Sequence, residues 1–278
     1  MILPKNELKE IVKTPKMFLI WGQSMSGKTY LARQFPSPIM LNTDGNASKI
    51  PEPSVEIHSF EQFMEAIEEL EKGNHTFETI VIDLIDDIAT MMEDFICRKN
   101  SNEKVTYTAL AEIPYGKGFS ERKAIWKALM MRLSQLPYNV IGISHFIERT
   151  ENDITIQQPS LEQVYLNMFK GRCDAYIKCS KIGNAYIQKC EEKRDNYVLA
   201  DVKDVKLNKA LENVRGLFAD SNNNTPAMKP TGMKKVETPV ATVEEKEETT
   251  ETPVENVKPE IVEVNKPTLK PALKKKEN

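Results

Sequence analysis

The feature that most constrains the fold of this chain is a glycine-rich turn between an apolar run and a helical pattern. The apolar run 17–21 leads into Gly22-Gln23-Ser24-Met25-Ser26-Gly27-Lys28-Thr29, which matches the pattern G-x-x-x-x-G-K-[ST]. Leu31, Ala32 and Phe35 follow at helical spacing. A loop between a strand and a helix turns several N–H groups inward, and the helix N-terminus adds positive partial charge. The pattern therefore predicts a phosphate-binding loop in an α/β fold.

Each fixed position of this loop has its own chemical reason. Lys28 can reach the β- and γ-phosphates, the Thr29 hydroxyl can bind Mg²⁺, and the two glycines allow backbone geometry that a Cβ would block. A chance turn with a surface lysine is the alternative, and the flanking strand and helix patterns argue against it. We predict ATP and Mg²⁺ as cofactors, held by Gly22, Gln23, Ser24, Met25, Ser26, Gly27, Lys28, Thr29 and Tyr30.

Composition divides the chain into a core and a tail. The last aromatic residue is Phe218, and the sequence after it is rich in Pro, Thr, Val, Glu and Lys. Such a segment cannot bury enough apolar surface to offset its ordering entropy. We predict an N-terminal segment (1–15), an ATPase core (16–218) and a disordered tail (219–278). The lysine run 274–276 could contact an acidic partner, or it could simply be solvated.

Bulk properties exclude several classes of protein. The net charge of −3 does not indicate a nucleic-acid coat, so any DNA contact must come from a local patch. The four cysteines form no C-x-x-C pair, which argues against a zinc site and a disulfide framework. No apolar run approaches the roughly 18 residues of a membrane span, and the N-terminus lacks a leader pattern. We expect a cytoplasmic protein with no membrane contact.

Strand and helix patterns alternate along the first two thirds of the chain. Continuous β-branched runs such as Thr79 to Ile82 are typical of strands covered on both faces. Together the patterns predict a three-layer P-loop fold with a mainly parallel sheet. Strands are expected at 17–21, 38–42, 55–58, 79–82 and 139–144, helices at 28–36, 59–73, 85–99 and 121–136, a polar loop at 101–119, and an antiparallel hairpin extension at 175–190.

Three further residues stand where parallel strands end, the edge at which ligands gather in such sheets. Asp83 could hold Mg²⁺; alternatively it caps the next helix, with Asp86 and Asp87 on a solvated face. Asp44 could orient the water that attacks the γ-phosphate, or it could belong to an ordinary Asp-Gly turn. His145 could donate to the γ-phosphate, or it could be a packing residue.

The order of these parts resembles the RecA-like recombinase core, and most closely the small phage-type ATPases linked to single-strand annealing and homologous recombination. The resemblance covers about residues 16–200. It rests on the phosphate loop and on Leu41-Asn42-Thr43-Asp44-Gly45, Ile80-Val81-Ile82-Asp83, Pro114-Tyr115-Gly116-Lys117-Gly118 and Ile141-Gly142-Ile143-Ser144-His145.

The resemblance implies roles for the site residues. Lys28 and Thr29 become the phosphate and Mg²⁺ ligands, and Asp83 the Walker B acid. Asp44 stands where the family has a catalytic glutamate, and His145 where it has a γ-phosphate sensor, so Lys28, Asp44 and His145 are the catalytic candidates. Because Asp44 is shorter than glutamate, hydrolysis is expected to be slow.

The resemblance also implies partners. Two family loops face single-stranded DNA, and their counterparts here are 115–119 and 146–172. These supply cations for phosphates and aromatic rings for stacking, although some of the rings could instead be core residues. The DNA-binding candidates are Tyr115, Lys117, Phe119, Arg149, Lys170 and Arg172. Assembly into a homo-oligomeric filament or ring is implied, with a neighbour's basic residue completing the site (Arg172, Lys178 and Lys181 are candidates), and a single-strand-binding protein is a further possible partner.

The expected function is thus a Mg²⁺-dependent, DNA-dependent ATPase that binds single strands and assists phage recombination or annealing in the host cytoplasm. A helicase-loader-like replication ATPase shares the same chemistry. A non-hydrolysing, nucleotide-gated DNA-binding module is made plausible by Asp44. A small-molecule kinase is disfavoured because no arginine-rich lid stands between residues 101 and 149.

Overall fold

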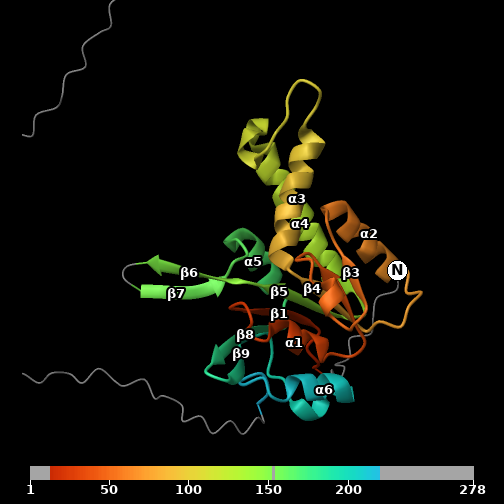
Figure 1. Cartoon of the computed structure of the whole chain (residues 1–278), viewed down its shortest axis with the longest axis vertical. Coiled ribbons are helices and arrows are strands. Elements are labelled where there is room, and N and C mark those ends of the chain that lie inside the picture. Colours follow the sequence, from red (N-terminus) through yellow and green to blue (C-terminus); the bar gives the residue numbers. More distant parts are fainter. Residues whose placement is uncertain (1–12, 152–153, 220–278) are drawn as a thin grey trace, which may run out of the picture. The chain divides into compact units, whose positions relative to one another are not determined.

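The computed structural model describes residues 13–151 and 154–219. Its main feature is a seven-stranded sheet in the order β3-β2-β4-β5-β1-β8-β9 (Figure 1). All neighbouring strands in it are parallel except the last pair, β8 and β9. The strands are β1 (Met17–Gly22), β2 (Pro38–Asn42), β3 (Ser54–Glu56), β4 (Thr79–Asp83), β5 (Asn139–Ser144), β8 (Ala175–Ile182) and β9 (Ala185–Lys193).

Helices cover both faces of this sheet, so the side chains of each central strand are buried on both sides. Along β1, Leu19 and Trp21 pack into one core, whereas Phe18 and Ile20 pack into the other. The first core is closed by α2 (Phe60–Glu71), α3 (Ile85–Asn100), α4 (Lys117–Gln135) and α5 (Gln163–Lys170), and the second by α1 (Lys28–Arg33) and α6 (Val205–Leu211). The predicted three-layer α/β fold with an antiparallel hairpin extension is confirmed for the described residues.

The start of α2 follows directly from its sequence. The Ser59 hydroxyl accepts from the Gln62 main-chain N–H at 3.2 Å, and the Gln62 side chain accepts from the His58 main-chain N–H at 2.9 Å. This pair resembles a capping box, except that Gln62 accepts from the residue before the N-cap rather than from Ser59 itself. Phe63, Ile67 and Leu70 then fall on one buried face, as their spacing predicts.

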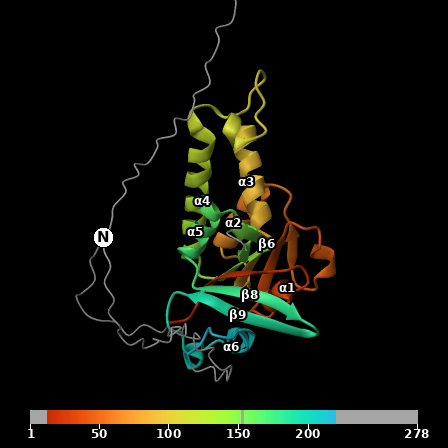
Figure 2. The same cartoon turned by 90° about the vertical axis from the view of Figure 1, so that its left-hand side faces the viewer.

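Two regions differ from the prediction. The expected long loop after β5 contains a separate antiparallel hairpin, β6 (Phe146–Glu151) with β7 (Ile154–Pro159), and then α5. The expected polar loop before α4 contains two short 3-10 turns, and α4 begins at Lys117 rather than at residue 121. Helices α3 and α4 project together away from the sheet (Figures 1 and 2).

Most of the predicted N-terminal segment and almost all of the predicted tail lie outside the part of the chain that the structure describes. Residues 1–12 of the N-terminal segment and residues 220–278 of the tail, including the lysine run 274–276, lie there. Among the described residues, no helix is both long enough and apolar enough to cross a membrane.

Candidate functional site

The phosphate loop joins the end of β1 to the first residue of α1. A Cβ on Gly22 would lie 2.1 Å from the carbonyl oxygen of Cys179 on β8, so only glycine fits there. Gly27 immediately precedes α1 with a φ of 88°, a left-handed conformation that favours glycine. Both glycines of the motif are therefore required by the backbone, as the sequence predicts.

The Lys28 side chain is folded back into this loop. Its ammonium donates to the carbonyl oxygens of Gly22 and Gln23, at 2.9 Å each. Burial lowers the pKa of Lys28, and the nearby negative charge of Asp83 opposes that shift. A buried ammonium held by two neutral carbonyl groups can exchange them for the charged oxygens of a phosphate.

Thr29 and Asp83 meet at the edge of the sheet. The Thr29 hydroxyl donates to a carboxylate oxygen of Asp83 at 2.8 Å, although the two residues lie 54 positions apart in the sequence. The capping alternative for Asp83 is wrong, because the N-cap of α3 is Leu84 and no side chain caps that helix. The two predicted Mg²⁺ ligands are thus in direct contact.

Asp83 is only 4% exposed. Burial raises its pKa to about 6, the negative charge of Asp44 adds to the rise, and the hydrogen bond from Thr29 opposes it. A buried carboxylate in this state gains from a cation placed beside it.

Two buried polar side chains beside the loop have no hydrogen-bond partner among the described residues. They are the hydroxyl of Ser26 and both amide atoms of Asn42. Asn42 ends β2 directly opposite Asp83 on β4, and the alternation along both strands turns the two side chains to the face of α1. Unpaired buried polar groups are costly and call for an explanation such as a missing ligand.

The donor set suits a nucleotide and Mg²⁺. No three His, Cys, Asp or Glu side chains cluster as metal ligands do within the described ranges. Mg²⁺ in nucleotide sites is commonly bound by one or two protein oxygens, with phosphates and waters completing the shell. The sequence analysis did not single out Asn42. The feature that could have pointed to it is its place as the polar residue that ends the otherwise apolar strand β2.

Asp44 lies at the rim of the site. It is exposed, and its carboxylate accepts hydrogen bonds from the main-chain N–H of Asn46 at 3.1 Å and from the Asn46 side chain at 2.5 Å. This is the geometry of the turn alternative. Its charge nevertheless acts on Asp83.

A second polar cluster surrounds Asp86, on the first turn of α3. Its carboxylate accepts from the Ser144 hydroxyl at 2.7 Å, from the His145 main-chain N–H at 2.8 Å, and from the Ser160 hydroxyl. Asp87 accepts from the Thr43 hydroxyl at 2.6 Å. The alternative that placed Asp86 and Asp87 on a solvated face is therefore wrong as well.

His145 links this cluster to the β6–β7 hairpin, which begins at the next residue. The main-chain carbonyl of His145 accepts from the Ser160 main-chain N–H at 3.0 Å, just after β7 ends. His145 itself is half-buried. The sensor role of His145 stays a prediction.

The structure does not bring the six predicted DNA-binding residues together. Tyr115 lies in the 3-10 turn just before α4, Lys117 and Phe119 lie on the first turn of α4, and Arg149 lies on the β6–β7 hairpin. The start of α4 and this hairpin are separate parts of the fold (Figure 1). Lys117 pairs with Glu121 at 3.5 Å. Of the rings that could be core residues, Phe169 and Tyr165 are buried.

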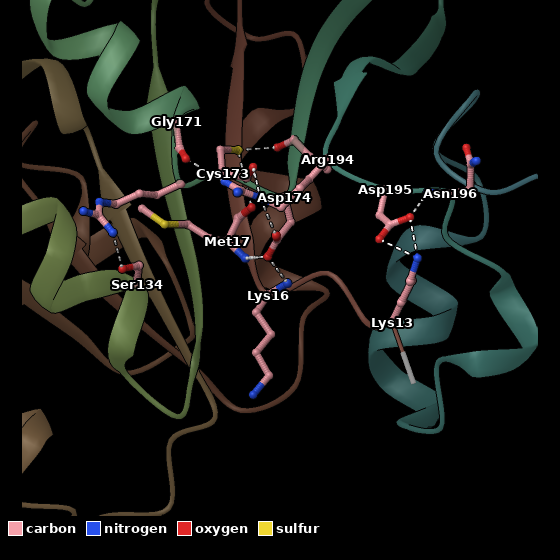
Figure 3. Close-up of polar contacts among 12 residues, drawn as sticks. Lys13, Lys16, Met17, Ser134, Gly171, Cys173, Asp174, Arg194, Asp195 and Asn196 are labelled. Carbon is pink, nitrogen blue, oxygen red and sulfur yellow. Dashed lines mark hydrogen bonds and ion pairs between the residues drawn. The ribbon is translucent and has the colours of Figure 1, made fainter. Parts of the chain in front are cut away.

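The other two candidates lie at the opposite edge of the sheet, where β1 begins. Lys170 pairs with Glu192, and Arg172 donates to the Ser134 hydroxyl at 3.3 Å. In this region Asp174 accepts from the main-chain N–H groups of Lys16 and Met17 (Figure 3). These contacts fix the start of β1. The phosphate loop lies at the other end of this strand, so Lys170 and Arg172 are remote from it.

Comparison with curated proteins found no match to this chain. Among solved structures, the chain is similar to the flagellar accessory protein FlaH from Methanocaldococcus jannaschii, with 10% sequence identity, a TM-score of 0.30, and coverage of 65% of this chain and 80% of that one. The family model described as an AAA domain matches residues 14–199. That range spans every element from β1 to β9 and thus the whole candidate site. The chain belongs to the AAA domain family of P-loop ATPases.

Proposed function

We propose that this protein binds ATP with Mg²⁺ at the loop 22–29 and hydrolyses it slowly. The observation that carries the proposal is the 2.8 Å contact between Thr29 and Asp83, beside the buried Lys28 ammonium. These groups are the hydroxyl, the carboxylate and the cation that phosphoryl transfer from ATP requires. The unpaired Asn42 amide lies on the same face of the sheet.

In this proposal each residue has one task. The main-chain N–H groups of the loop and the Lys28 ammonium bind the phosphate oxygens, and Thr29 and Asp83 hold Mg²⁺. When bound, Mg²⁺ neutralises negative charge on the phosphates. Asn42 and Asp44 orient the attacking water, and hydrolysis is slow because Asp44 is short and engaged with Asn46.

Lys28→Ala tests the site. The variant is expected to lose Mg·ATP binding in calorimetry while keeping the circular dichroism spectrum of the parent. Lys127→Ala, which removes an exposed lysine from α4, is the matched control and should bind normally. Undiminished ATP affinity in Lys28→Ala would overturn the proposal.

The partner we propose is single-stranded DNA, bound during recombination or annealing by a homo-oligomeric filament or ring. The support is chemical: Tyr115 is fully exposed and Phe119 is 45% exposed, with Lys117 between them in sequence. Exposed rings beside a cation can stack on bases and pair with phosphates. The β6–β7 hairpin, which carries Arg149, is attached beside the nucleotide site through Asp86.

ATP turnover measured with and without a single-stranded oligonucleotide tests this partner. Stimulation is expected in the parent, and a loss of stimulation with intact basal turnover in Tyr115→Ala. The assembly mass, measured with ATP and the oligonucleotide, should exceed that of one chain. Equal turnover with and without DNA, and no DNA binding, would count against the partner but leave the ATP site standing.

The exposed, Asn46-bound carboxylate of Asp44 favours a second candidate, a nucleotide-gated binding module that does not hydrolyse ATP. It predicts tight Mg·ATP binding with no turnover in the presence or absence of DNA. The same turnover assay therefore separates the two functions.

A further inference from the structure

A cavity of about 570 Å³ opens directly beside the phosphate loop. One wall belongs to the loop and to α1, and the other belongs to β9. Its lining residues are Met25, Gly27, Lys28, Thr29, Tyr30, Tyr186 and Gln188. The cavity therefore shares Lys28 and Thr29 with the phosphate site and adds surface that phosphates do not use.

Tyr186 is the residue that joins the two walls. A Cβ placed on Gly27 would lie 3.2 Å from the ring of Tyr186, so the ring rests against the main chain at the start of α1. On β9, Tyr186 is paired with Lys181 of β8, whose ammonium lies 5.2 Å from the ring centroid. Tyr186 is nevertheless 54% exposed.

The rest of the lining is also exposed and largely aromatic or apolar. The Tyr30 side chain, one residue after Thr29, is 65% exposed, and Met25 is more exposed still. The Gln188 carboxamide makes no hydrogen bond with any described residue. Aromatic and apolar surface with a few unpaired polar groups is the usual lining of a small-molecule site.

We propose that this cavity holds the base and ribose of the bound nucleotide, with the base stacked on Tyr186. The inference rests on the proposed function, because phosphates held at Lys28 and Thr29 place the remainder of the molecule within reach of this cavity. Stacking on a tyrosine accepts any base, since every base has a π-face. Gln188 supplies the polar contact to an edge of the base or to the ribose.

Two ligands separate stacking from phosphate binding. Mg·ATP carries a base, whereas Mg·tripolyphosphate carries only the phosphates. In calorimetry on the full chain, Tyr186→Ala is expected to weaken ATP binding about tenfold, the size of effect seen when one stacking ring is removed. Its affinity for tripolyphosphate should change less than about twofold. Tyr186→Phe, which keeps the ring, should bind both ligands as the parent does.

The outcomes are distinct. Equal losses of ATP and tripolyphosphate affinity in Tyr186→Ala would overturn the inference, because the ring would then only support the loop at Gly27. Unchanged ATP affinity would overturn it as well. Tyr30→Ala, measured in the same way, provides a second test on the other wall should Tyr186→Ala fold poorly. A parent protein that binds neither ligand would instead refute the proposed function, and with it this inference.

Discussion

Asp83 is a carboxyl group for which burial favours the protonated state, yet its proposed task requires the charged one. Burial raises its pKa from 3.8 to about 6. The folded protein therefore binds this proton more tightly than the unfolded chain does. Stability from this group is fully present below about pH 4 and is lost as the pH rises through about 6.

Asp83→Asn removes the free-energy cost of burying a charged carboxylate at this position. In the absence of nucleotide and divalent cation, the variant is expected to raise the free energy of unfolding by about 1–3 kcal/mol at pH 8, with the gain shrinking toward zero at pH 4. Urea titrations at the two pH values measure this. The same variant should bind Mg·ATP more weakly; a variant less stable than the parent at pH 8 would contradict the assignment of burial as the dominant cause.

Asn42 offers a similar test without a charge. Replacing its unpaired buried amide with an apolar group of similar size removes a desolvation penalty, so Asn42→Leu should stabilise the ligand-free protein by about 1 kcal/mol. If Asn42 positions the attacking water, turnover should fall about tenfold. Thermal melts and ATPase rates check the two effects separately, and Asn139→Leu, at the other end of the sheet on β5, is the control for the rate.

The sequence was enough to predict that Lys28, Thr29 and Asp83 lie together, because a short motif and one strand end define them. Sequence reasoning missed Asn42 and Asp86 for a physical reason. Their roles depend on which strands become neighbours, and Asp86 meets Ser160 across 74 positions of sequence. Local patterns carry no information about such pairings.

At the scale of elements, β5 and α5 pack through a glycine. A Cβ on Gly142 would lie 2.9 Å from the ring of Phe169, closer than real side chains approach. Gly142→Ala is expected to cost about 1–3 kcal/mol of stability through overpacking. Adding Phe169→Leu should recover part of that loss, which a double-mutant cycle by urea unfolding measures. Strictly additive losses would show that the two residues are not coupled.

The β6–β7 hairpin and the start of α4 were not predicted, because neither has a clear alternation of apolar and polar residues. In the β6–β7 hairpin, even the apolar Ile147 and Ile156 are partly exposed, so no buried face marks the strands. The early start of α4 was not predicted, because Gly116 and Gly118 are typical of a loop rather than of a helix. Gly118 is in fact required within that helix, because a Cβ there would lie 2.6 Å from the carbonyl oxygen of Leu110.

At the scale of the whole molecule, the segment after β9 completes the second core. Tyr197, Leu211, Leu217 and Phe218 are buried there with residues of β1 and α1. A chain ending at Ala219 should keep the melting temperature of the full protein, whereas one ending at Asp201 should fail to melt cooperatively or should aggregate. Calorimetric scans of the two truncations test this, and a cooperative transition in the shorter chain would contradict it.

The order of the strands also bears on how copies of this chain could assemble. One border of the sheet is β3, which has only three residues, and the other is β9, whose main chain already exchanges hydrogen bonds with Arg215 through Gln188 and Cys190. Unpaired borders are where sheets add strands from other molecules. At these two borders β3 is too short, and β9 is occupied in its middle by Arg215, so neither offers an uninterrupted row of main-chain groups for joining one seven-stranded sheet to the next.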